Sequence, residues 1–499
     1  MSIRGNVVAN FSGSIWAAVM SLAFVPFYIR FMGVESYGIV GVYTSLVAML
    51  AVLDLGLTQV MNREMARLSH DSNNDTQLVN TAYTLERVYW LMAIVIAGFV
   101  AVLAGPIANF WLNPQDIARE DLMRAMQMIG IVIGLRWPVS FYMGGLNGLQ
   151  RQVIANVILG FFSSLQGLGA LFVLWLIAPT IQAFFTWQVV VALIHVLVLK
   201  LALHRSLPSG QRGIFDNTIL KNIWRFAAGM SGIALMTTVL TQLDKLVLSR
   251  VLPLKEFGYY VFASAVAAVI FRLVGPVFTA YYPRLTELVA QGKESALVTE
   301  YHQGSQLMSA AILPVGVLLV FFSSEVLEVW TFDSRLTVNA SLLISVLTIG
   351  NLLNGLLHLP YSLQLAHGWT KLAFYQNLLA VIFLGPAIYF ATIRWGALGA
   401  AAIWVVLNLA YLSIGNQVMH ARLLKSEKWQ WYLHDLGKPL LCVITLCLFA
   451  RFFAAGAVGF WPTLIILLIT LFLSMIAVIA SSRFLRSISI SYIRRVISK

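Results

Sequence analysis

Charged residues are scarce in this 499-residue sequence. Aspartate, glutamate, lysine and arginine make up 11% of the chain, against 60% hydrophobic residues, whereas about a quarter of the residues of an ordinary soluble domain are charged. No polar segment is long enough to fold as a soluble domain. The composition therefore excludes a soluble globular protein and indicates a polytopic membrane protein.

Several motifs that carry chemistry are also missing. The two cysteines, Cys442 and Cys447, lie five residues apart in an apolar segment and are interpreted as helix residues rather than a disulfide or a metal site. The eight histidines do not form an HExxH pattern, and there is no GxxxxGK[ST] loop for ATP hydrolysis. There is also no long loop of the kind that a glycan ligase or polymerase uses for catalysis. We predict a transporter without metal or cofactor, rather than an enzyme.

Hydrophobic runs of the length that crosses a bilayer, roughly 20 residues, recur along the whole chain. The N-terminus has no small-residue cleavage site, so it is interpreted as a retained first span. The pattern predicts an all-α protein with about 14 transmembrane helices, at 6–30, 37–61, 79–104, 124–146, 153–178, 184–203, 223–250, 257–280, 301–322, 337–363, 372–391, 397–418, 439–455 and 461–481.

The 33 lysine and arginine residues against 20 acidic ones give a net charge of +13. The basic residues are scattered between apolar runs, which is typical of membrane topology rather than of nucleic-acid binding. Most of them fall in alternate loops, and cytoplasmic loops are the ones that carry an excess of lysine and arginine. The charge distribution predicts a multi-pass membrane protein with both termini in the cytoplasm.

An internal repeat relates the two halves of the chain at an offset of 220 residues. "ESYG" at 35–38 aligns with "KEFG" at 255–258, and "NGLQR" at 147–151 aligns with "HGWTK" at 367–371. Each copy holds six spans, so both copies have the same orientation, and parallel repeats of this type enclose a central path. We predict two six-helix lobes, 1–216 and 217–435, followed by two additional helices and a basic tail at 436–499.

Four basic residues lie deep within predicted spans: Arg87, Arg136, Lys245 and Arg272. A charged side chain at bilayer depth costs about 2.5 to 3.5 kcal/mol, so such residues face a protein interior or a wet cavity. We predict that these four cations line one hydrated cavity and bind an anionic substrate. Polar side chains at helical spacing form stripes on the spans 6–30, 79–104 (with Asn80 and Thr84) and 223–250. Four residues of these stripes are predicted to line the same cavity: Asn10, Thr84, Thr241 and Gln242.

Three acidic residues, Asp54, Glu86 and Asp244, are candidate ion-coupling groups or charge partners of these cations. The sequence leaves an alternative open, in which Glu86 neutralises Arg87, Asp244 neutralises Lys245, and Asp54 pairs with a mid-span arginine. Arg136 and Arg272 have no acid adjacent in sequence, and each is followed closely by a proline that would bend its helix.

Several motifs together resemble a known family. "GVESYG" (33–38), "DLGLTQVMNREMA" (54–66), "TQLDKLVLSRVL" (241–252), "FGYYVFA" (257–263) and "LQLAHGWTKL" (363–372) are similar to Wzx-type oligosaccharide flippases. That family belongs to the multidrug/oligosaccharidyl-lipid/polysaccharide exporter superfamily. The resemblance implies two six-helix lobes around a central cavity, with two further helices.

The resemblance also implies a substrate, an oligosaccharide repeat unit on undecaprenyl pyrophosphate, as in O-antigen and lipopolysaccharide synthesis. The function it implies is translocation of this unit from the cytoplasmic to the periplasmic leaflet of a bacterial cytoplasmic (inner) membrane. Membrane lipids, a polysaccharide polymerase and a chain-length regulator are the partners expected with it. Two alternatives on the same fold stay open: a flippase for lipid II or another polyprenyl glycan, and a cation-coupled drug antiporter.

Overall fold

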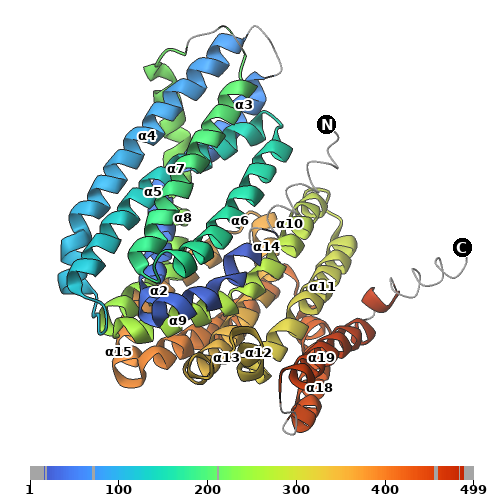
Figure 1. The fold of residues 1–499 in the computed structure, drawn as a ribbon. Helices are drawn as coiled ribbons and strands as arrows, with labels where there is room; N and C mark the ends of the chain where they lie inside the picture. Colours follow the sequence, from blue (N-terminus) through green and yellow to red (C-terminus); the bar gives the residue numbers. More distant parts are fainter. Residues whose placement is uncertain are drawn as a thin grey trace, which may run out of the picture. The chain divides into compact units, whose positions relative to one another are not determined.

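The computed structural model describes residue 16 and residues 19–69, 74–208, 210, 213–454, 459–482 and 484–487. Within these ranges the chain is helical and contains no strand (Figure 1). Two compact units divide it, Met1–Gly258 and Tyr259–Lys499. The all-α membrane fold predicted from hydropathy is confirmed.

The first unit is built around helices α4, α5 and α7. Its elements are α2 (Val25–Leu50), η1 (Ala51–Asp54), α3 (Leu57–Leu68), α4 (Asp75–Pro106), η3 (Ile107–Trp111), α5 (Arg119–Gly148), α6 (Gln152–Leu176), α7 (Ile181–Ser206) and α8 (Asn217–Val251). Leu85, Tyr89, Phe141, Tyr142 and Leu199 are fully buried where the three helices meet. Two of these are tyrosines, whose hydroxyl groups need partners at that depth.

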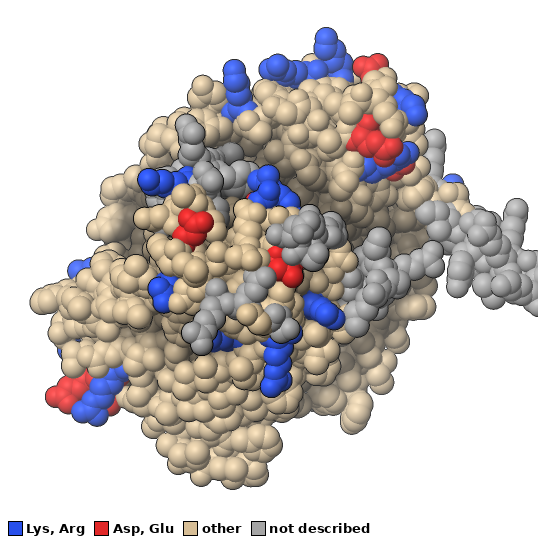
Figure 2. Space-filling model, turned by 90° about the horizontal axis from the view of Figure 1, so that it is seen from above, with Lys and Arg blue, Asp and Glu red and all other residues tan. Residues whose placement is uncertain are grey.

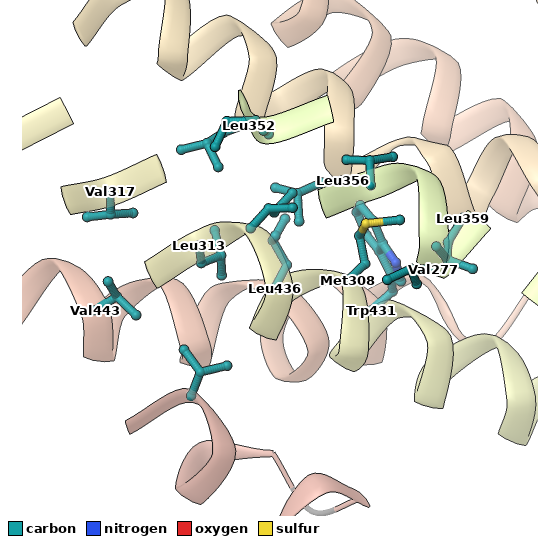
Figure 3. Close-up of a cluster of buried hydrophobic side chains, with 14 of the residues drawn as sticks. Val277, Met308, Leu313, Val317, Leu352, Leu356, Leu359, Trp431, Leu436 and Val443 are labelled. Atoms are coloured by element: carbon teal, nitrogen blue, oxygen red, sulfur yellow. The ribbon is translucent and has the colours of Figure 1, made fainter. Parts of the chain in front are cut away.

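The second unit is centred on α11, against which α10, α13, α18 and α19 pack. Its elements are α9 (Leu254–Ala267, which crosses the division), α10 (Val269–Ala290), α11 (Glu294–Phe321), α12 (Ser323–Thr331), α13 (Ser334–Leu356), α14 (His358–Ala366), α15 (Lys371–Ala410), η4 (Tyr411–Gly415), α16 (Asn416–Leu423), α17 (Lys428–Gln430), η5 (Trp431–Gly437), α18 (Lys438–Ala454) and α19 (Phe460–Ser481). Figure 3 shows its core, in which Trp431 and Leu436 of η5 meet Met308 and Leu313 of α11.

Eleven helical segments are long and apolar enough to cross a membrane in the described part of the chain. One of them, Lys371–Leu423, includes two predicted spans, whereas Val25–Asp54 covers the end of the span 6–30 and most of the span 37–61. The predicted span 223–250 falls in α8, which is not among the eleven, and residues 6–15, 17 and 18 of the span 6–30 lie outside the described residues. The multi-pass membrane architecture is confirmed, while the count of fourteen stays a prediction.

Two glycines interrupt the long helices. Gly33 in α2 has φ 83° and Gly396 in α15 has φ 61°. An L side chain avoids this left-handed region, whereas glycine enters it without steric cost. Gly396 lies between the predicted spans 372–391 and 397–418. A single glycine with positive φ therefore separates them, where a loop would be expected.

The repeat-related glycines Gly38 and Gly258 take part in a reciprocal contact inside the first unit. A Cβ added at Gly38 would lie 2.7 Å from the carbonyl oxygen of Leu254, and one added at Gly258 would lie 2.2 Å from the carbonyl oxygen of Val34. Val34 and Leu254 are themselves related by the offset of 220 residues. The glycine of each repeat therefore packs against the equivalent carbonyl of the other repeat. This reciprocal contact supports the internal repeat.

The loop after η3 also contacts equivalent positions of both repeats. The buried carboxylate of Glu35 accepts the backbone N–H groups of Gln115 at 2.5 Å and Asp116 at 2.8 Å. Lys255, the repeat counterpart of Glu35, places its Nζ 3.6 Å from the Asp116 carboxylate. Because the buried carboxylate satisfies two backbone donors, it fixes the loop to α2.

The predicted lobe boundaries at 216/217 and 435/436 remain predictions. The division between the compact units falls at 258, because α8 packs on α2, η1, α3 and α4 of the first unit.

Candidate functional site

Arg136 lies in the middle of α5 and is half-buried. Its Nη2 donates a hydrogen bond to the amide oxygen of Gln188 at 2.9 Å, and its guanidinium carbon lies 5.8 Å from the ring centre of Tyr43. The buried Nε has no hydrogen-bond partner. In the described part of the chain no carboxylate forms an ion pair with Arg136. The guanidinium therefore keeps an uncompensated charge and one unused donor.

Arg87 is exposed on α4 and stacks on the ring of Tyr83, with 4.4 Å between its guanidinium carbon and the ring centre. It also donates a hydrogen bond to the Tyr83 hydroxyl. Its sequence neighbour Glu86 points elsewhere, because consecutive residues of an α-helix are about 100° apart around the axis. The alternative in which Glu86 neutralises Arg87 is therefore wrong.

Glu86 is buried and interacts with α5 and α7 instead. Its carboxylate accepts a hydrogen bond from the Tyr142 hydroxyl at 2.7 Å and lies 3.1 Å from Lys200 Nζ and 3.0 Å from His204 Nε2. Lys200 and His204 come from the last two turns of α7 and are themselves half exposed. This arrangement satisfies the carboxylate and ties three helices together. This arrangement was not predictable from the sequence, because Tyr142 is 56 residues from Glu86 and the two bases are more than 100 residues away.

Asp54 ends η1 at the break before α3. Its carboxylate accepts the backbone N–H of Thr58 at 3.2 Å and the hydroxyls of Thr58 at 2.8 Å and Tyr89 at 2.5 Å. Leu55 and Gly56, which follow it, both have positive φ. Asp54 therefore caps the restarted helix, and among the described residues it forms no ion pair with a mid-span arginine, so that alternative is wrong.

The polar stripe predicted on span 79–104 is partly covered by the linker between α7 and α8. Asn80 Oδ1 accepts the backbone N–H of Ile214 at 2.8 Å, and Thr84 Oγ1 accepts that of Asp216 at 3.0 Å. Thr84 is fully buried, which does not fit its predicted place on a cavity wall. The linker needs acceptors for its backbone N–H groups, and the polar side chains of α4 provide them. Asp216 in turn caps α8, and hydrogen bonds from Thr218 hold the pKa of Asp216 below its ordinary value.

The remaining candidates lie in α8 and α10. Lys245 is half-buried, with its Nζ 3.4 Å from Gln242 Oε1, and Thr241 is exposed. Asp244 is half-buried beside them. Arg272 is exposed near the start of α10, in the second unit. Asn10 lies outside the described residues.

Each of the four cations that the sequence singled out thus has its own surroundings. Arg87 contacts Tyr83, Arg136 contacts Gln188 and Tyr43, and Lys245 contacts Gln242. In the ranges that the structure describes, none of these four partners is acidic. Figure 2 shows one face of the molecule, on which lysine and arginine side chains outnumber the acidic ones. The basic excess is therefore not cancelled by ion pairing at these candidate positions.

A sequence profile of the family described as "Polysaccharide biosynthesis protein" matches residues 3–289, more than half of the chain. The chain belongs to this family. It is also 24% identical over 411 residues to a Shigella flexneri protein named "Putative O-antigen transporter", covering 81% of this chain and 95% of that protein. The resemblance noted from the motifs is confirmed.

Solved structures of membrane transporters share the fold. A lipid II flippase, MurJ in an inward closed conformation, superposes with a TM-score of 0.67 at 13% identity, over 96% of this chain and 98% of that one. An inward-facing multidrug transporter of the MATE family, in the MOP superfamily, gives a TM-score of 0.66 at 12% identity, over 86% and 96% of the two chains. At these identities the likeness concerns the fold of this polysaccharide biosynthesis family member and not its substrate.

Proposed function

We propose that this protein is a flippase for undecaprenyl-pyrophosphate-linked oligosaccharide repeat units. It moves them from the cytoplasmic to the periplasmic leaflet of a bacterial inner membrane, through a basic central cavity that opens alternately to each side. Family membership and the similarity to the Shigella flexneri protein support a polysaccharide substrate. The observation on which the mechanism rests is Arg136, a mid-helix guanidinium whose described contacts include no acid.

The physical problem is to carry a sugar head and a pyrophosphate across hydrocarbon. An isolated ion in an apolar medium costs tens of kcal/mol by the Born estimate, whereas a hydrated passage with fixed cations removes most of that cost. The planar guanidinium presents paired donors that match phosphate oxygens better than an ammonium does. Arg136, Arg272, Arg87 and Lys245 are the proposed contacts, and the polyprenyl tail stays in lipid.

The membrane potential favours this direction of transport. With the inside negative, each negative charge moved outward gains about 2.3 kcal/mol per 100 mV. We expect transport of a pyrophosphate-linked substrate in proteoliposomes to accelerate when an inside-negative potential is imposed. Rates that ignore the potential would remove this energy source and leave coupling to an ion gradient.

Complementation of a deletion strain tests the substrate class. Arg136→Ala and Arg272→Ala should reduce surface glycan about 10- to 100-fold at native expression, since a charge-assisted hydrogen bond contributes about 1.5–3 kcal/mol. Arg136→Lys separates charge from geometry and should retain part of the activity. Arg394→Ala, which removes an exposed arginine stacked on Trp395, is the matched control and should behave as wild type.

The position of the accumulated intermediate distinguishes the rival functions. A flippase defect leaves undecaprenyl-linked repeat units on the cytoplasmic leaflet, whereas a defective ligase or polymerase leaves them on the periplasmic leaflet. A drug antiporter leaves no such intermediate, and a lipid II flippase leaves lipid II. Normal glycan from both arginine variants, with normal amounts of protein in the membrane, would refute the proposed phosphate contacts.

A further inference from the structure

A buried histidine in the second unit bridges two carboxylates. His302, on α11, has its Nδ1 in contact with Asp435 Oδ2 of η5 and its Nε2 3.1 Å from Glu427 Oε2, just before α17. His302 is 5% exposed and Asp435 is 1% exposed. The carboxylates come from the segment between α16 and α18, more than 120 residues further along the chain.

Hydrogen-bond accounting fixes the number of protons at this site. A neutral imidazole has one N–H donor and one lone pair, and an ionised carboxylate can only accept. Two nitrogen–carboxylate contacts need two protons between the three groups. Either the imidazole carries both, or one carboxyl group is protonated and donates to the neutral ring. Both arrangements hold one proton more than a neutral histidine between two ionised carboxylates. Among the described residues no group of three His, Cys, Asp or Glu side chains is arranged to hold a metal ion, and the proton count above accounts for both contacts of the ring.

The same contact fastens several elements to one face of α11. Gln306 Nε2 donates to Asp435 Oδ1 at 2.8 Å, and the Ser309 hydroxyl donates to the Asp435 carbonyl at 2.7 Å. Gln306 Oε1 accepts the hydroxyl of Ser482, at the end of α19, at 2.5 Å. Residues 302, 306 and 309 share a helical face. The site therefore links the approach to α18 and the end of α19 to α11.

Apolar packing surrounds this polar contact. Trp431 and Leu436 flank Asp435 along η5 and are buried against α11 and α14 (Figure 3). The Trp431 Nε1 donates to the Ser305 hydroxyl at 3.1 Å. Loss of the proton would leave a nitrogen lone pair facing a carboxylate in surroundings with little water, and a buried polar contact of that kind is strongly destabilising.

Other ionisable groups nearby have contacts of their own. The Tyr301 hydroxyl lies 3.3 Å from Nε2 of His420, whose Nδ1 faces the carbonyl of Asn416. Arg284 of α10 pairs with Glu287 at 2.8 Å and with Glu300 of α11 at 3.6 Å. The others come from α14, α17, η5, α18 and the C-terminal end. They are His358, whose Nδ1 faces the Asn354 carbonyl of α13, Lys428 over Trp429, Tyr432, and the exposed Lys438 and Arg486.

We propose that His302, Asp435 and Glu427 form a proton-binding site, and that the bound proton holds segment 427–437, and with it α18, against α11. Release of the proton undocks this segment. The site uses no substrate contact and stands independently of the transport function proposed above.

Hydrogen exchange of the full-length protein in lipid nanodiscs between pH 6 and pH 10 tests this proposal. Once the intrinsic pH dependence of exchange is removed, the opening constant of amides in 427–437 should rise tenfold per pH unit between the pKa of an ordinary histidine, about 6.5, which His302 has when the segment is undocked, and the pKa of the docked site, because the docked state holds one proton more than the undocked state in that range. Amides of the α4–α5 core should show no such slope. A flat profile for 427–437 in the wild-type protein would overturn the proposal.

Two isosteric variants sharpen the test. In Glu427→Gln the new amide N–H donates to the His302 lone pair, while the remaining oxygen still accepts from the Ser426 hydroxyl, as it does at 3.0 Å in the native protein. Asp435→Asn does the same at Nδ1 and keeps its acceptor for Gln306. Neither variant needs the extra proton, so the amides of segment 427–437 should stay protected from hydrogen exchange at every pH. Glu300→Gln, on the same helix, should retain the wild-type slope. A wild-type slope in either isosteric variant would refute the site.

Discussion

Replacing Gly258 by alanine adds a methyl group at the point where two repeat-related segments approach most closely. The new Cβ would lie 2.2 Å from the carbonyl oxygen of Val34, against an ordinary contact of 3.4 Å or more, so the backbones must separate by about 1.2 Å. At Gly38 the corresponding distance to the Leu254 oxygen is 2.7 Å, which requires about 0.7 Å. Overpacking of this kind costs about 1–3 kcal/mol. We expect Gly258→Ala at the upper end of that range and Gly38→Ala at the lower end.

Gly98→Ala is the matched control, because Gly98 lies within helix α4 and an added Cβ there meets nothing within 4 Å. Removing a mid-helix glycine stabilises by about 0.5–1 kcal/mol. Thermal melting of the purified proteins, followed by the loss of the monodisperse peak in size-exclusion chromatography, should give a ranked series. Gly98→Ala should melt at or above wild type, then Gly38→Ala, then Gly258→Ala.

The double variant adds a second criterion. Both methyl groups enter one contact, and once the backbones have separated for the first, the second costs less, so the two effects should be less than additive. If Gly258→Ala melted as high as Gly98→Ala, the two segments would not touch in the folded protein, and the reciprocal contact would be refuted.

Further substitutions test three carboxylates, those of the buried Glu86 and Glu35 and of the half-buried Asp54. Glu86→Ala should destabilise the protein by about 1–3 kcal/mol, because it removes the acceptor of Tyr142 and the counter-charge of two half-exposed bases, and Glu86→Gln should cost less. Melting temperatures that fall from wild type to Glu86→Gln to Glu86→Ala would agree with this, and the reverse order would contradict it. Glu35→Gln should cost about 1–3 kcal/mol, because one of two backbone donors loses its acceptor. Glu120→Gln, at an exposed position of α5, is the control, and equal melting temperatures of the two variants would contradict the role of Glu35 in fixing the loop after η3. Asp54→Asn should cost about 1 kcal/mol through the weakened cap of α3, and hydrogen exchange of α3 should increase while that of α6 does not; unchanged α3 exchange would argue against the cap.

Hydropathy alone predicted the helical spans, because a bilayer requires long apolar helices whatever their tertiary packing. The predicted span boundaries at 30/37 and 391/397 bracket Gly33 and Gly396, but hydropathy did not show that a glycine makes the break. In both places the helix is kinked at a glycine with positive φ and no polar loop is present, which only the backbone geometry reveals.

The partners of the buried charges could not be read from the sequence. Glu86 next to Arg87 suggested a local pair, yet helical geometry points the two side chains to different neighbours, and α7 supplies the bases. His302 gave no signal either, because its carboxylates lie in a connecting segment with no hydropathy pattern. The depth of Arg136 was predictable from its position in a span, while its pairing with an uncharged amide was not.

The exchange of glycine and carbonyl between Val34–Gly38 and Leu254–Gly258 has the symmetry of an isologous dimer interface, in which one patch binds a copy of itself. Because the two copies belong to a single polypeptide, the sequence of each copy can change independently of the other. Glu35 and Lys255 show this, because they occupy matching positions but carry opposite charges. Glu35 accepts a hydrogen bond from the backbone N–H of Asp116, and Lys255 faces the Asp116 side chain. Substitutions in these two segments therefore act on an interface in which the backbone contacts are still twofold symmetric, whereas the side chains at matching positions are no longer identical.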